Sequence, residues 1–248
     1  MADSVTVTAT ELIVVAVAIY FAAFVQVLSG FGFALLSMPI MTIALPVEKA
    51  VVVSTILGMI ATLYQSRLLR ADTQWPLAKR LIIAALCGMP LGLVILNVVS
   101  DTALKVALGV AVLVATALLA ARLNLSQASN HLDHGVGFIS GVLTTSLSTN
   151  GPPLVFGLQA RHLDAPAFRA TIATVFAVTN VVGLALFIAN GKVTGDGLLA
   201  SAIAFPAWLL GQVSAWPVRK HVHGERFRVL VLALLFIAGT FTIVFAVF

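Results

Sequence analysis

Two short segments rich in glycine and proline interrupt apolar stretches of the chain, and they hold the residues best suited to chemistry. The first is Ser29-Gly30-Phe31-Gly32-Phe33, and the second is Ser148-Thr149-Asn150-Gly151-Pro152-Pro153. Glycine and proline disrupt helices, and a disrupted helix at membrane depth leaves backbone N–H and C=O groups that lipid cannot satisfy. Such groups persist only beside protein or a watery cavity. Two interruptions in matching halves therefore predict a transport site.

The polar groups around both interruptions are neutral hydrogen-bond donors and small residues. The predicted substrate-binding residues are Gln26, Ser29, Gly30, Gly32, Ser148, Thr149, Asn150, Gly151, Pro152 and Asn180. Free N–H groups at helix N-termini, together with hydroxyl and amide donors, bind an anion without burying a full counter-charge. Serine and threonine also join helices in membrane interiors, and for residues 144–146 both interpretations stay open.

Ionisable side chains are essentially absent from the apolar segments, where they would mark proton relays or ion sites. This absence argues against an intramembrane enzyme and against a cation transporter built on carboxylates. His221 and His223 are two residues apart in a basic loop and do not share a helix face. We therefore predict no catalytic residue, no metal site and no cofactor.

Lys49 and Arg169 occupy equivalent positions in the two halves, each at the start of a helix that follows an interruption. A cation at a helix N-terminus opposes the helix dipole, so each needs a compensating role. The functional hypothesis is that they attract anions to the two mouths of a pathway. The alternative is that both side chains simply extend to the membrane interface.

The composition indicates an all-α, polytopic membrane protein whose main partner is the lipid bilayer. Of 248 residues, 60% are hydrophobic and 9% are charged, whereas soluble domains carry about 25% charged residues. The formal charge of +5 lies in short loops, where it serves membrane topology rather than nucleic-acid binding. The single cysteine, Cys87, excludes an internal disulfide, and the N-terminus lacks the basic region of a cleaved signal peptide.

Ten apolar segments can be distinguished, five in each half of the chain. They cover residues 11–28, 33–45, 48–66, 80–99, 103–121, 135–148, 152–160, 167–189, 197–217 and 227–248. We predict a first transmembrane repeat at 1–121, a cytoplasmic linker at 122–134 and a second repeat at 135–248. The first segments of each repeat, 11–45 and 135–160, form either a broken, kinked span or a helix–break–helix hairpin.

Loop charge predicts the orientation of the halves. The loops near 67–80 and 219–228 are basic and are expected on the cytoplasmic side. Counting back from them places residues 45–48 outside and residues 159–166 inside. The two repeats are therefore predicted to be inverted relative to each other, with both termini outside.

The motifs in their order resemble one family over residues 10–247. These motifs are Gly30-Phe31-Gly32-Phe33 with Pro39, Gly137-x3-Gly141 before Asn150-Gly151-Pro152-Pro153-Leu154, and Phe168-Arg169-Ala170-Thr171 with Asn180. They are similar to the sulfite exporter TauE/SafE family of bacterial membrane permeases. Ser148-Thr149-Asn150-Gly151 stands where many members have a run of glycines.

The resemblance implies a multi-pass secondary transporter of the bacterial inner membrane that exports sulfur-containing anions such as sulfite or organosulfonates. Alternating access is the expected mechanism. A passive anion channel and a membrane subunit of a larger complex remain alternatives. The particular anion, the direction, the coupling ion and a possible homodimer stay open at this stage.

Overall fold

The computed structural model describes residues 8–29, 31–121, 129–218 and 225–247, and these are all helical or in loops. The elements are α1 (Ala9–Ser29), α2 (Phe33–Ala44), α3 (Val47–Leu68), the 3₁₀ helix η1 (Arg70–Asp72), α4 (Trp75–Val98), α5 (Asp101–Ala120), α6 (Asn130–Leu147), α7 (Gly151–Gln159), α8 (Ala165–Ala189), α9 (Gly195–Val218) and α10 (Glu225–Val247). The all-α prediction is confirmed. Six of these helices are long and apolar enough to cross a membrane.

Local sequence signals explain where several helices begin. The Ser100 side chain accepts a hydrogen bond from the N–H of Ala103 at the start of α5, and Asp164 accepts one from Ala167 at the start of α8. Asp101 also accepts from the N–H of Val47, which joins the start of α5 to the start of α3 (2.7 Å). Each bond satisfies one of the N–H groups that a helix leaves unpaired at its first turn.

The second half begins earlier than predicted. Helix α6 starts at Asn130, so residues 130–134 belong to the helix and not to the predicted linker. The Ser129 side chain accepts from the N–H of Leu132 and caps the helix. Residues 122–128, the rest of the predicted linker, lie outside the described residues.

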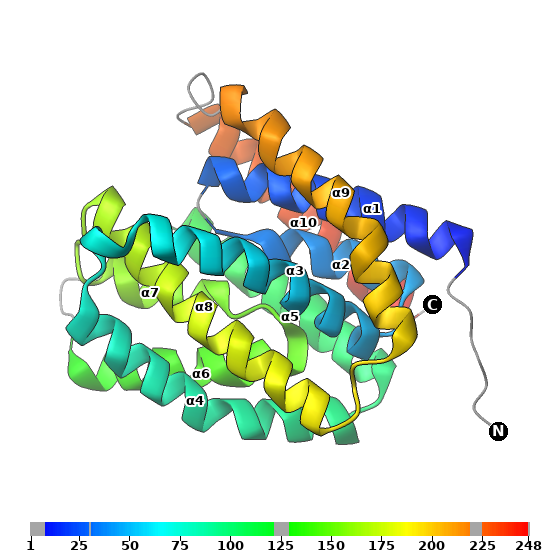
Figure 1. Ribbon diagram of the computed structural model, residues 1–248, viewed down its shortest axis with the longest axis horizontal. Helices are drawn as coiled ribbons and strands as arrows, with labels where there is room; N and C mark the ends of the chain where they lie inside the picture. Colours follow the sequence, from blue (N-terminus) through cyan, green and yellow to red (C-terminus); the bar gives the residue numbers. More distant parts are fainter. Residues whose placement is uncertain (1–7, 30, 122–128, 219–224, 248) are drawn as a thin grey trace.

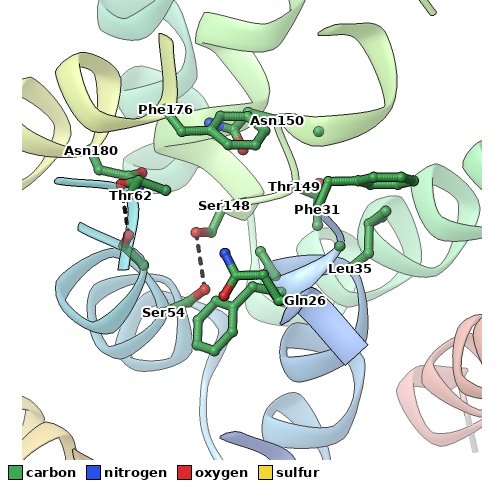
Figure 2. A pocket seen from close by; sticks show the side chains of 15 residues that line it. Gln26, Phe31, Leu35, Ser54, Thr62, Ser148, Thr149, Asn150, Phe176 and Asn180 are labelled. Carbon is green, nitrogen blue, oxygen red and sulfur yellow. Dashed lines mark hydrogen bonds between the residues drawn. The ribbon is translucent and has the colours of Figure 1, made fainter. Parts of the chain in front are cut away.

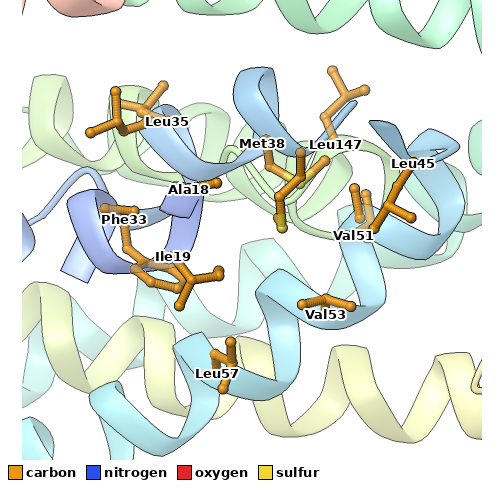
Figure 3. Packing of buried hydrophobic residues seen from close by; sticks show 14 of the residues in the cluster. Ala18, Ile19, Phe33, Leu35, Met38, Leu45, Val51, Val53, Leu57 and Leu147 are labelled. Carbon is orange, nitrogen blue, oxygen red and sulfur yellow. The ribbon is translucent and has the colours of Figure 1, made fainter. Parts of the chain in front are cut away.

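Two helix pairs flank the bundle, with α3 and α8 between them (Figure 1). Helix α1 packs along α9 on one flank, and α4 packs along α6 on the other. Figure 3 shows apolar side chains of α1, α2 and α3 meeting in the core, with Ile19, Met38 and Leu57 fully or almost fully buried. In water, burial of one such side chain stabilises a fold by about 1.5–3 kcal/mol. Between helices in lipid, the stabilisation comes instead from close packing.

Glycines bring the helices of one flank into backbone contact. A Cβ atom added at Gly141 of α6 would lie 1.9 Å from the carbonyl oxygen of Ala85 in α4. The same test at Gly88 and Gly92 of α4 gives 2.2 and 2.1 Å to backbone oxygens of α6. Small residues allow this close approach, which is a common way of packing helices in membranes.

One buried carboxylate links three elements at an end of the bundle. Asp133 of α6 is 1% exposed and accepts hydrogen bonds from Arg80 Nε of α4 (3.1 Å) and from Arg161 Nη2 after α7 (2.6 Å). Since Asp133 was assigned to the linker, the sequence did not reveal this role.

Replacing Asp133 with asparagine should leave two arginines facing each other without a counter-charge. Breaking a buried ion pair costs about 3–5 kcal/mol, and because both arginines are partly exposed we expect about half of that. Thermal unfolding of the purified protein in detergent measures the loss. Asp72→Asn, at an exposed position, is the control, and equal unfolding midpoints for the two variants would contradict the prediction.

Candidate functional site

Both interruptions line one small cavity of about 40 Å³ between α1, α2, α3, α7 and α8 (Figure 2). A cavity of this size holds about three water molecules, or a small ion without most of its hydration shell. The lining residues are Gln26, Phe31, Gly32, Phe33, Ala34, Leu35, Ser54, Gly58, Thr62, Ser148, Thr149, Asn150, Gly151, Phe176 and Asn180. None of these side chains carries a charge.

The first interruption presents backbone donors. Gly32 precedes α2 with φ of +91°, a left-handed conformation that favours glycine. The side chain of a residue at this position often caps the helix, but Gly32 has none. Within the described part of the chain, no acceptor is bonded to the N–H groups of Phe33, Ala34 or Leu35. The positive end of α2 therefore lies at the cavity.

The second interruption presents side-chain donors instead. Ser148 follows the last residue of α6 in a left-handed conformation with φ of +57°, and its hydroxyl bonds to that of Ser54 in α3 (3.3 Å). Asn150 directly precedes α7, and its backbone carbonyl accepts from Ser140. Pro152 has no N–H group and does not line the cavity. The predicted substrate-binding residues that do line it are Gln26, Gly32, Ser148, Thr149, Asn150, Gly151 and Asn180.

Two lining side chains are buried with an unpartnered polar atom. Gln26 is 4% exposed and Thr149 is 1% exposed, and neither Gln26 Oε1 nor Thr149 Oγ1 has a hydrogen-bond partner among the described residues. An unsatisfied buried polar group costs about 1–3 kcal/mol. The Gln26 amide can present either its oxygen or its nitrogen by a half-turn. Both side chains are therefore available to a polar ligand in the cavity.

Sequence reasoning missed the contribution of α3. Ser54, Gly58 and Thr62 face the cavity, and Thr62 accepts a hydrogen bond from Asn180 of α8 (3.3 Å). The three residues recur every fourth position, which places them on one face of a helix. This stripe of small and hydroxyl residues within an apolar helix was the signal that could have identified them.

The remaining predicted residues lie elsewhere. Lys49 forms an ion pair with Asp196 at the start of α9 (3.4 Å), and neither Lys49 nor Arg169 lines the cavity. The first-interruption residue Gly30 and the side chain of Ser29 lie outside the described residues.

The six candidate spans indicate a multi-pass membrane protein, and a small cavity with neutral polar and aromatic walls lies where its helices are interrupted. Interrupted helices around a central site are typical of secondary transporters. The chain matches the family model described as Sulfite exporter TauE/SafE over residues 15–242, and it therefore belongs to that family. The resemblance based on the motifs is thus confirmed. The family is described as one of exporters, in agreement with the prediction of transport. Comparison with curated proteins and with solved structures gave no match.

Proposed function

We propose that this protein exports small sulfur-containing anions by alternating access, with the anion held in the cavity between the two interruptions. The main support is the pair of unpartnered buried groups, on Gln26 and Thr149, in a cavity lined by neutral donors. An anion accepting hydrogen bonds from such groups needs no buried counter-charge.

In this proposal the first turn of α2 supplies backbone donors to the anion, and side chains near α7 and in α8 supply further donors. The N–H groups of residues 33–35 and the dipole of α2 favour negative charge. Thr149, Asn150 and Asn180 add hydroxyl and amide donors to the same cavity. Ser29 and Gly30, in the first interruption, are proposed to complete the site.

Packing supports two repeats, α1–α5 and α6–α10, related by approximate twofold symmetry. In such a pair of repeats α1 corresponds to α6, α2 to α7, and so on to α5 and α10. The contact between α4 and α6 then corresponds to that between α9 and α1, and the contact between α3 and α9 to that between α8 and α4. All four of these contacts are present. Helix α1 also packs against α2, and α6 against α7, as expected for two hairpins. Alternating access would move one such repeat against the other.

Contacts between counterpart helices support the inverted orientation. Asn180 of α8 bonds to Thr62 of α3, whereas Gly183, further along α8, faces Thr55, which comes earlier in α3. Helices α3 and α8 are therefore antiparallel where they meet. A twofold axis in the membrane plane requires this of equivalent helices.

The membrane potential supplies a driving force for export. An anion that leaves a cell with a negative interior gains about 2.3 kcal/mol per charge per 100 mV. No acidic residue lines the cavity within the described ranges, so the proposal requires no proton carrier in the site. Lys49 outside and Arg169 inside remain proposed as groups that attract anions to the two mouths.

Flux into proteoliposomes tests the proposal with sulfite, thiosulfate, sulfoacetate, taurine and sulfate. Asn150→Ala should lower transport efficiency for the preferred anion about ten- to a hundredfold, because a hydrogen bond to a charged group contributes about 1.5–3 kcal/mol. Its backbone carbonyl, which accepts from Ser140, is retained. Asn190→Ala, at an exposed residue after α8, is the matched control.

Equal flux in wild-type protein and Asn150→Ala for every anion would exclude this site. Saturable flux that is stimulated by anion on the opposite side is expected for a carrier. Flux that rises linearly with concentration and voltage would indicate a channel and contradict alternating access.

A further inference from the structure

A groove lies between α3, α4 and α8, and it shares no lining residue with the small cavity between the two interruptions. Its volume is about 380 Å³. Its walls are mainly apolar and come from all three helices, including Leu63, Ile82, Ala177, Val178, Val181 and Val182. These apolar side chains offer no donors to a dehydrated sulfur anion, so a ligand that fills the groove needs an apolar part.

Two arginines border this groove. Arg67 at the end of α3 and Arg70 in η1 both line it and are exposed at the surface. No ion pair joins either guanidinium to a carboxylate within the described residues. Trp75, 43% exposed, lies beside them, and tryptophan favours the level of lipid headgroups.

From this basic end the groove runs along α8, which is one of the candidate membrane spans. Thr174 of α8 bonds to Thr73, which follows η1, and the lining continues along α8 to Val182. Eight residues of α-helix rise about 12 Å, which is close to the depth of one leaflet's hydrocarbon region. A chain of methylene groups could follow this path while a charged headgroup stayed at the arginines.

We propose that the groove binds an anionic phospholipid, with its phosphate between Arg67 and Arg70 and one acyl chain along α8. Charge complementarity selects the headgroup, since each basic residue near an anionic membrane surface contributes about 1 kcal/mol. The apolar walls select the chain. The bilayer that surrounds the spanning helices supplies the ligand at high local concentration, and the proposal does not depend on the identity of the transported anion.

Lipid binding to the full chain, purified and delipidated in detergent, tests this inference by native mass spectrometry. Phosphatidylglycerol should bind more tightly than phosphatidylcholine with the same acyl chains. The double variant Arg67→Gln/Arg70→Gln should weaken phosphatidylglycerol binding about thirtyfold, as expected from about 1 kcal/mol per arginine. Lys105→Gln/Lys192→Gln lowers the net charge equally at the other end of the bundle and should leave this affinity unchanged.

Two further measurements examine the acyl chain. Ala177→Trp fills the groove without changing charge and should reduce binding of the intact lipid. Glycerol phosphate has the headgroup chemistry without acyl chains. At the concentration at which phosphatidylglycerol saturates the site, glycerol phosphate should not displace phosphatidylglycerol. Equal affinity for the two lipids, equal loss in both double variants, full binding by Ala177→Trp, or competition by glycerol phosphate would each overturn the proposal.

Discussion

Replacing Gly141 with alanine is expected to prevent α4 and α6 from packing. The added Cβ would lie 1.9 Å from the carbonyl oxygen of Ala85, and two further backbone atoms of Ala85 lie within 2.8 Å. A backbone cannot move aside as the end of a flexible side chain can, so the two helices must separate. We expect destabilisation of at least about 3 kcal/mol, the upper end of the usual cost of overpacking, and little folded protein.

Gly135 of the same helix provides the matched control, because a Cβ added there meets nothing within 4 Å. Alanine favours a helix over glycine by about 1 kcal/mol at either position. Any difference between the variants therefore reports the close approach of α4 and α6 and not helix propensity. Size-exclusion chromatography and thermal unfolding in detergent measure it. A folded Gly141→Ala protein as stable as Gly135→Ala would show that α4 and α6 do not pack as described.

The sequence predicted the helices of this fold well, because apolar runs and the residues between them carry the signal. Ten segments were expected, and the ten α-helices of the described ranges begin and end within a few residues of most of them. The largest differences are at the starts of α4 and α6, where Trp75 and Asn130 each come five residues before the predicted segments 80–99 and 135–148. The difference at α6 has a clear cause. Its first turn is polar, and Asp133 was therefore placed in a linker although two arginines compensate its burial.

The arrangement of the helices could not be predicted in the same way. That Gly141 touches Ala85 depends on which helices are neighbours, and one sequence contains no such pairing information. The Gly137-x3-Gly141 spacing does not indicate which helix approaches these glycines. The packing of α1 along α9 likewise joins segments almost 200 residues apart.

Part of the candidate site could be predicted because interrupted helices have strong chemical signals. The segments around Gly32 and Asn150 do line one cavity. The division of donors between them was not foreseen: α2 presents backbone N–H groups, whereas Pro152 and Pro153 remove them from the first turn of α7. Ser54 and Thr62 were missed because hydroxyl residues in membrane helices commonly bond to their own backbone, as Thr62 does to Gly58.

Replacing Gln26 with glutamate should nearly abolish anion transport. Gln26 is 4% exposed and lines a cavity in which no described side chain is charged. Glutamate has almost the same shape but adds a negative charge. Two like charges 4 Å apart repel by about 4 kcal/mol at an effective dielectric constant of about 20, which corresponds to a loss of several hundredfold or more. The measurement is initial flux of the preferred anion into proteoliposomes.

Two comparison variants separate charge from shape. Gln26→Met removes the amide without adding charge and should lower transport by about ten- to a hundredfold, the effect of losing one hydrogen bond to a charged ligand. Gln159→Glu adds the same charge at an exposed position at the end of α7 and should leave flux unchanged. If Gln26→Glu transported the anion as well as Gln26→Met, the solute would not pass beside residue 26. A second contrary result would be that Gln26→Glu transports a cation as fast as the wild-type protein transports its anion. In that case the neutral cavity would not select for negative charge, and the donors around α2 and α7 would need a different ligand.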